Sequence, residues 1–183
     1  MRDFKRSGPI IKMKLTDYEA TLLESLVDQF AGLLEDGSEP LESSDPFERL
    51  AAESVTPELD RSDPVISRLF PDAYPDDPGA SADFRRFTQA RQRDTRLGEA
   101  EIVLTALRDS DAGEHPVQVR VIELDAWLKT LTAVRLSLAV RLNIETASDA
   151  EELDQLPDDD PRSYIYRVYE WIAYLTENLI GLA

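Results

Sequence analysis

Carboxylates lie next to one another at several places in the chain, two of which stand out, and clustered carboxylates can bind divalent metals or perform acid–base catalysis. Asp76 and Asp77 form a pair, and residues 158–160 are three consecutive aspartates. A calcium loop alternates its oxygen ligands around a tight glycine turn and ends on a distal glutamate, and neither stretch has that spacing. Acid–base catalysis needs an enclosed pocket that raises one carboxyl pKa, whereas neighbouring aspartates in a proline-rich turn are typical of solvated surface. We therefore predict no metal site.

The side chains of nucleophilic catalysis are also missing. The sequence has no cysteine, which removes thiol catalysis, thiol redox sensing and cysteine-based zinc sites together. His115, the single histidine, lies in a Gly-Glu-His-Pro turn, and no G-x-S-x-G motif accompanies it. We predict a protein with no catalytic residue and no cofactor, and hence not an enzyme.

A basic stripe is the strongest charge feature, because five arginines of one predicted helix face a single acid, Asp94. Three explanations remain open: the stripe neutralises the protein's own acids, binds an acidic protein partner, or binds nucleic acid. The formal net charge of −17 makes direct nucleic-acid binding weak. The stripe consists of Arg85, Arg86, Arg91, Arg93 and Arg96.

The segment from residue 63 to residue 88 combines prolines, aromatic rings and charges. Its three prolines, at positions 71, 75 and 78, restrict the backbone around Phe70 and Tyr74. Such specific residues in a connecting segment indicate a shaped surface that binds a protein partner. In a competing interpretation the phenylalanines are core and the two aspartates are neutralised by the two arginines. The predicted partner-binding residues are Tyr74, Asp76, Asp77, Arg85 and Arg86.

Apolar spacing predicts a mainly α fold, a single helical domain over residues 1–183 with a small antiparallel sheet. Short β-type runs around Ser7-Gly8-Pro9 predict an N-terminal hairpin, and alternating valines predict a strand near 117–122. Both are followed at once by a helix, so we expect their strands to share one sheet. The predicted helices start at Thr16, with Glu19 completing a capping box, and then cover 63–69, 81–109, 125–143 and 164–179.

Two acidic stretches interrupt these elements. Residues 35–62 are predicted to be a loop-rich segment with one short helix near 45–53, after Gly37 ends the first long helix. Residues 145–160 contain no basic side chain and are predicted to be a mobile acidic loop.

The helix over 125–143 is apolar nearly all round, which predicts a central position. It nevertheless contains Arg135 and Arg141, and an unpaired buried charge costs several kcal/mol. We therefore expect both arginines to be structural, in a buried network of ion pairs or capped carbonyls, with an anion or partner site as the alternative. Trp127 and Trp171 are expected to be structural core residues.

The chain begins with a charged stretch and has no apolar run of the roughly 20 residues that a membrane-spanning helix needs. A cytoplasmic location without membrane binding is the expectation.

Several blocks together resemble one family. They are KLTDYEA at 14–20, DPVISRLFPDAYPDDP at 63–78, DFRRFT at 83–88, AWLKTLTAVRLSLAVRL at 126–142 and YEWIAYLTENL at 169–179. The chain resembles, over nearly its whole length, an actinobacterial domain-of-unknown-function family that includes an oxidative-stress-sensing transcriptional regulator. The resemblance implies a regulator that acts with a sigma factor. In that regulator sensing is attributed to a cysteine pair, and this chain has none.

The leading hypothesis is thus a non-enzymatic regulatory protein that binds a component of transcription. The alternatives are an adaptor of a proteolytic system, a scaffolding homodimer, and an enzyme without a recognisable motif.

The net charge generates the first testable prediction. We expect the isolated chain to bind duplex DNA no more tightly than about 10⁻⁴–10⁻⁶ M near physiological salt, because its basic stripe lies in a strongly acidic protein. Titration of labelled duplexes measures this affinity. Nanomolar, sequence-selective binding would contradict it.

Overall fold

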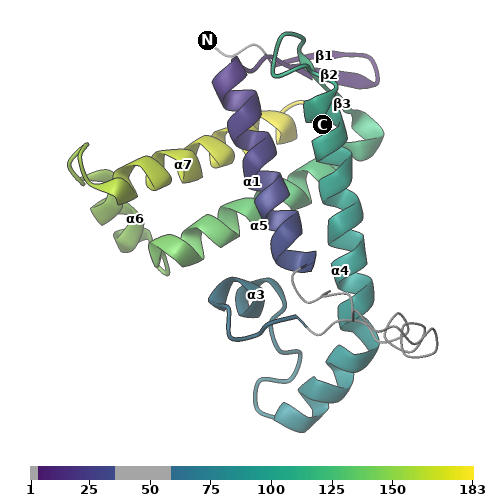
Figure 1. Ribbon diagram of the computed structural model, residues 1–183, viewed down its shortest axis with the longest axis vertical. Coiled ribbons are helices and arrows are strands. Elements are labelled where there is room, and N and C mark those ends of the chain that lie inside the picture. The colour runs from purple at the N-terminus through teal and green to yellow at the C-terminus, as the bar shows by residue number, and fades with distance from the viewer. Residues whose placement is uncertain (1–3, 36–58) are drawn as a thin grey trace, which may run out of the picture.

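Three antiparallel strands form one small sheet at an end of the molecule (Figure 1). The computed structural model describes residues 4–35 and 59–183; the predicted helix near 45–53 and the predicted helix end at Gly37 lie outside them. β1 (Phe4–Ser7) and β2 (Ile10–Met13) form the predicted hairpin, and Gly8 takes the left-handed φ of 60° that its turn requires. β3 (Val117–Arg120) pairs with the other edge of β2, so the expectation of a shared sheet is confirmed.

The strand after residue 117 is shorter than predicted. β3 ends at Arg120, and the 3-10 helix η1 (Val121–Glu123) continues directly into the next helix. The Val121 N–H donates to the Pro9 carbonyl at 2.8 Å, one position beyond the last residue pair of β2 and β3.

The helix after the hairpin, α1 (Asp17–Glu35), begins at the predicted capping box. The Thr16 N–H donates to Glu19 Oε2 at 3.0 Å, and the Glu19 N–H donates to Thr16 Oγ1 at 3.3 Å. Each side chain therefore satisfies a backbone donor that has no partner within the helix. One face of α1, with Leu23 and Val27 at its centre, is fully buried.

The next helices start at Asp-Pro pairs. α3 (Pro64–Leu69) is capped by Asp63 and ends before Pro71, as predicted. α4 (Pro78–Arg108) starts three residues earlier than the predicted Ser81. The cause is a second Asp-Pro pair: Asp77 caps the helix and Pro78 occupies the first helical position, where its missing N–H costs nothing.

α5 (Leu124–Leu142) has the predicted central position. It contacts α1, α3, α4 and α7 (Pro161–Ile180), and the fully buried side chains of Trp127 and Leu131 lie at its core-facing side. The architecture is mainly α with a small antiparallel sheet, which confirms the predicted fold class.

Residues 145–160, predicted to be a loop, contain a helix instead. α6 (Ala147–Asp154) starts at a capping box in which the Thr146 N–H donates to Asp149 Oδ2 at 2.7 Å. The Glu145 and Thr146 N–H groups and the Thr146 hydroxyl donate to Asp149 and lower its pKa. The buried Leu153 anchors the helix to α7 through a small apolar cluster with Leu142 and Tyr166. The prediction of a loop relied on the acidic composition of this stretch and overlooked its capping box and its apolar Leu153.

The expected buried network of Arg135 and Arg141 is not observed. Arg141 is exposed, and the Arg135 side chain is 39% exposed. The Arg135 guanidinium stacks on the Tyr169 ring at 4.2 Å and lies 3.9 Å from Glu170 Oε1. The C-terminal half of α5 extends beyond the main core, so its arginines reach water. Trp127 is a core residue as expected, whereas Trp171 is only partly buried.

No helix among the described residues is long and apolar enough to cross a bilayer.

A pair of glycines tests the packing between the hairpin and the turn that follows α4. Gly113 has a φ of +83°, and a Cβ there would lie 2.9 Å from the Leu15 carbonyl oxygen. We expect Gly113→Ala to lower the free energy of unfolding by about 2 kcal/mol or more, because it adds a clash to a strained backbone.

Gly98 lies within α4, and a Cβ there would meet nothing within 4 Å. Gly98→Ala should raise the free energy of unfolding by about 0.5–1 kcal/mol. Denaturant unfolding measures both values, and equal effects would contradict the assigned contacts.

Candidate protein-binding surface

The N-terminal half of α4 extends past the other helices (Figure 1). After Ser81, the next buried residue of this helix is Ala100. The intervening residues, about five turns of helix, contribute no residue to the buried core and carry the whole basic stripe. A long exposed half-helix with this composition is the starting point of the candidate site.

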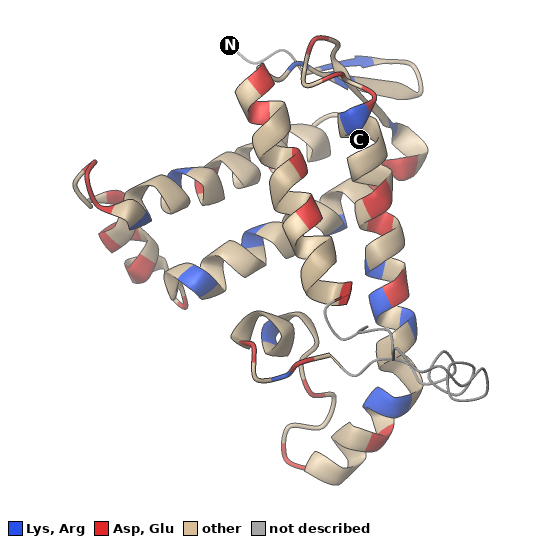
Figure 2. Cartoon of the chain, viewed as in Figure 1, with Lys and Arg blue, Asp and Glu red and all other residues tan. Residues whose placement is uncertain are grey.

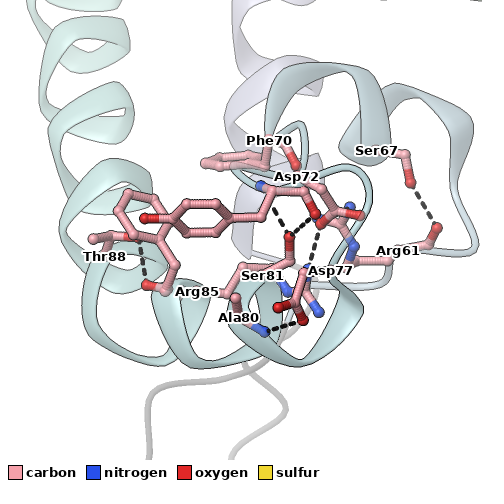
Figure 3. A network of polar contacts seen from close by, with 11 residues as sticks. Arg61, Ser67, Phe70, Asp72, Asp77, Ala80, Ser81, Arg85 and Thr88 are labelled. Atoms are coloured by element: carbon pink, nitrogen blue, oxygen red, sulfur yellow. Dashed lines mark hydrogen bonds and ion pairs between the residues drawn. The ribbon is translucent and has the colours of Figure 1, made fainter.

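The loop before α4 is fixed by one aspartate between two arginines (Figure 3). Asp72 Oδ1 accepts a hydrogen bond from Arg61 Nη2 at 3.1 Å and forms a second, short ion pair with Arg85. Arg61 also donates from Nη1 to the Phe70 carbonyl at 2.8 Å. These charge-assisted bonds connect the segment before α3, the loop and α4.

Ser81, in the first turn of α4, fastens the same loop from the other side. Its buried hydroxyl donates to the Tyr74 carbonyl at 2.8 Å and accepts from the Tyr74 N–H at 3.1 Å. Asp77 caps the helix by accepting the Ala80 N–H at 2.9 Å (Figure 3). The backbone around Tyr74 is therefore held in one shape without any partner present.

Phe70 joins this assembly to the core. Its ring is buried, and the Arg96 guanidinium carbon lies 5.1 Å from the ring centroid. Arg96 also donates to the Leu69 carbonyl at 3.1 Å. Burial lowers the pKa of Arg96, and the neighbouring Glu99 opposes that shift, so the guanidinium stays charged at neutral pH.

Three aromatic rings remain at the surface of this fixed scaffold. Tyr74 and Phe84 meet edge to face, with ring centroids 6.2 Å apart. Tyr74 is 51% exposed, Phe84 is 40% exposed, and Phe87, one turn further along α4, is 80% exposed. We call these rings, together with Arg85 and Arg86, the aromatic–arginine surface. Clustered exposed aromatics beside arginine are typical of protein interfaces.

Charge is distributed unevenly along α4 (Figure 2). The five arginines of the stripe lie between residues 85 and 96, whereas Glu99 and Glu101 follow towards the C-terminal end. Arg86 lies 3.9 Å from Asp83 with both side chains exposed, and Arg91 forms no ion pair within the ranges that the structure describes. Against a net charge of −17, this half-helix is a local basic patch.

An open groove of about 590 Å³ adjoins this patch between α4 and α5. Both apolar and charged side chains line it. The apolar ones include Leu69, Leu128, Ala133 and Leu136, and the charged ones are Arg91, Arg96, Glu99 and Lys129. The groove offers an apolar contact area continuous with the arginines.

The predicted site residues are brought together in part. Tyr74 and Arg86 are exposed as expected, and Arg85 is half-buried against Asp72. Asp77 is a helix cap, and Asp76 is exposed in the turn. The pairing of both aspartates with both arginines, which the competing interpretation required, is not observed: Arg85 pairs with Asp72, and Arg86 lies near Asp83.

Sequence reasoning missed Asp72, Arg61 and Ser81. Asp72 directly follows Pro71, whose ring restricts the backbone of the loop, and this position was a usable signal for Asp72. The contact of Arg61 with Asp72 joins the two sides of α3, and no local spacing reveals it.

Within residues 4–35 and 59–183, no group of three or more acidic or histidine side chains could hold a metal ion. His115 is exposed in the turn between α4 and β3.

The fold defines a mainly helical protein with a small sheet, and comparison with known sequences places it in a family. The chain belongs to DUF2017, described as a domain of unknown function, whose family model matches residues 1–183.

Curated relatives include the oxidative stress regulator AosR of Mycobacterium tuberculosis and of Mycobacterium bovis. Each is 27% identical over 190 residues, which cover 96% of this chain and 83% of the relative. No solved structure matches the chain significantly.

Two neighbouring aspartates test the assigned helix cap. Asp77→Ala should lower the free energy of unfolding by about 1 kcal/mol, since it removes the acceptor of the Ala80 N–H. Asp76→Ala is the matched control and should change it by less than about 0.5 kcal/mol. Denaturant unfolding of both variants distinguishes them, and a larger loss for Asp76→Ala would disprove the cap.

Proposed function

We propose that this chain is a non-enzymatic regulatory protein that binds a component of the transcription machinery, such as a sigma factor, through the aromatic–arginine surface. The observation that carries the proposal is the exposure of Phe87 and Tyr74 on a scaffold that is already fixed by Asp72 and Ser81. An isolated exposed ring is ordinary, but several rings on a braced loop and helix are typical of a binding surface.

Preorganisation supports the binding role energetically. Association costs free energy for each side chain or loop that becomes ordered, about 0.5–1.5 kcal/mol per flexible side chain. The Tyr74 backbone is hydrogen bonded to Ser81 on both its N–H and its carbonyl, so little backbone ordering remains for a partner to induce. Aromatic and arginine side chains are also the most frequent hot spots of protein interfaces.

The relatives support the regulatory part of the proposal. AosR is named an oxidative stress regulator, and this chain is similar to it over 96% of its own length. The chain has no cysteine, so thiol sensing is not part of the proposal. The basic patch on α4 favours a partner with an acidic contact surface. A second copy of this chain is disfavoured, because two proteins with a net charge of −17 repel one another.

Affinity capture tests the proposal with a charge-reversed variant. Arg86→Glu combined with Phe87→Ser changes two exposed residues and leaves the Asp72 contacts intact. We expect the immobilised parent chain to retain a sigma factor or an RNA polymerase subunit from an extract of its own cells. The double variant should retain at least tenfold less, because it loses an apolar contact and reverses a charge.

The matched control is Arg141→Glu with Ile180→Ser, which makes the same kind of change on exposed residues of α5 and α7. It should retain the partner as the parent does, and all three proteins should unfold at similar temperatures. The proposal fails if the parent retains no transcription component. The assignment of the surface fails if both double variants lose the partner equally or neither does.

A further inference from the structure

Two exposed tyrosines touch through their hydroxyl groups, and they come from opposite ends of the sequence. Tyr18 lies in the first turn of α1 and Tyr164 in the first turn of α7 (Figure 1). Their phenol oxygens form a short hydrogen bond. Tyr18 is 60% exposed and Tyr164 is 46% exposed, so both rings are open to solutes.

The remaining tyrosines have different surroundings in the described structure. Each packs its ring against another ring: Tyr74 against Phe84, Tyr174 against Phe4, and Tyr166 against Tyr169.

Oxidisable side chains gather at this contact. Tyr18, Tyr164 and Trp171 all line one surface pocket of about 370 Å³. The chain has no cysteine, and Met13 is fully buried. Among the described residues, exposed tyrosines and the partly buried Trp171 are therefore the side chains open to a one-electron oxidant in the surrounding solvent. The hydrogen bond with Tyr18, together with partial burial, raises the pKa of Tyr164, so the phenol stays protonated at neutral pH.

We propose that Tyr18 and Tyr164 form an oxidative cross-linking site, at which a one-electron oxidant joins the two side chains as dityrosine. The geometry suits the product, because a carbon–carbon bond between the two ortho positions leaves both hydroxyl groups side by side. The phenol oxygens already touch, and each ortho carbon is two bonds from its own oxygen. Coupling then requires the two rings to turn so that an ortho carbon of each faces that of the other.

The reaction balances with an external oxidant of the peroxide-derived radical class. Each phenol loses one electron and its hydroxyl proton, which gives a phenoxyl radical with spin density on its ortho carbons. The two radicals combine between these carbons. The two bonded carbons then release their hydrogens as protons, and both oxygens take up a proton again. In total two tyrosines lose two electrons and two protons, and two one-electron oxidants are reduced.

The cross-link would tie together two helix ends that are 146 residues apart in the chain. Closing so long a loop removes conformational freedom mainly from the unfolded chain, as a disulfide does. We expect the cross-linked protein to have a Tm about 10 °C above that of the parent. The site is separate from the aromatic–arginine surface and does not depend on the proposed function.

The experiment exposes the dilute full chain to a limiting dose of light-generated tris(bipyridine)ruthenium(III), a one-electron oxidant. After trypsin digestion, we expect peptide 15–49 joined to peptide 163–167, two hydrogens lighter than their sum, in tandem mass spectrometry. Fragment ions should locate the bond at Tyr164, and not at Tyr166 of the same peptide. The yield should fall severalfold in urea, where the folded contact is lost.

Conservative variants separate this pair from general tyrosine oxidation. Tyr18→Phe and Tyr164→Phe should each abolish the linked peptide and the rise in Tm. Tyr166→Phe and Tyr74→Phe should leave both unchanged. Absence of the linked peptide from the folded parent, an equal yield in urea, or oxidation that stops at Trp171 would overturn the proposal.

Discussion

Burial of helix α5 is the constraint on which the rest of the fold depends. Its side chains Trp127 and Leu131 are fully buried, and the helix is apolar on several sides, so it needs neighbours on each of them. Helices α1, α3, α4 and α7 supply those neighbours. The burial of a large aromatic and several aliphatic side chains stabilises the domain by roughly 25 cal/mol for each Å² of apolar surface removed from water. The sheet covers only one end of this bundle, which explains why three short strands suffice.

The aromatic–arginine surface is a consequence of the length of α4. Only its C-terminal half is needed to cover α5, and its buried residues accordingly begin at Ala100, apart from Ser81. The other half is free to present Phe84, Phe87 and the arginines to solvent. Without tertiary cover, an exposed half-helix frays easily. The Asp77 cap and the bonds between Asp72 and Arg85 brace this end, so the surface is held by polar contacts where apolar packing is missing.

The local chemistry of helix starts made much of the fold predictable. Thr16 with Glu19, and Asp63 with Pro64, mark helix starts in the structure as in the sequence. The same logic also marks Asp77 and Thr146, where composition was given more weight than capping signals.

The candidate site was less predictable. The arginine stripe and the exposed Tyr74 followed from the sequence, but the choice of Asp72 over Asp76 as the partner of Arg85 depends on how α3 turns the chain. Likewise, the apolar pattern around Arg135 and Arg141 could not show that this end of α5 extends beyond the core.

The order of strands in the sheet also bears on how the protein emerges from the ribosome. The middle strand is β2, near the N-terminus, and its second neighbour is β3, where Val119 pairs with Ile11. The hairpin therefore leaves the exit tunnel long before the strand that completes its sheet, and Ile11 and Met13 stay uncovered while most of the chain is synthesised. Contacts between such distant residues slow folding, and exposed apolar strands attract other chains. The nascent hairpin is thus open to chaperones until β3 has been synthesised.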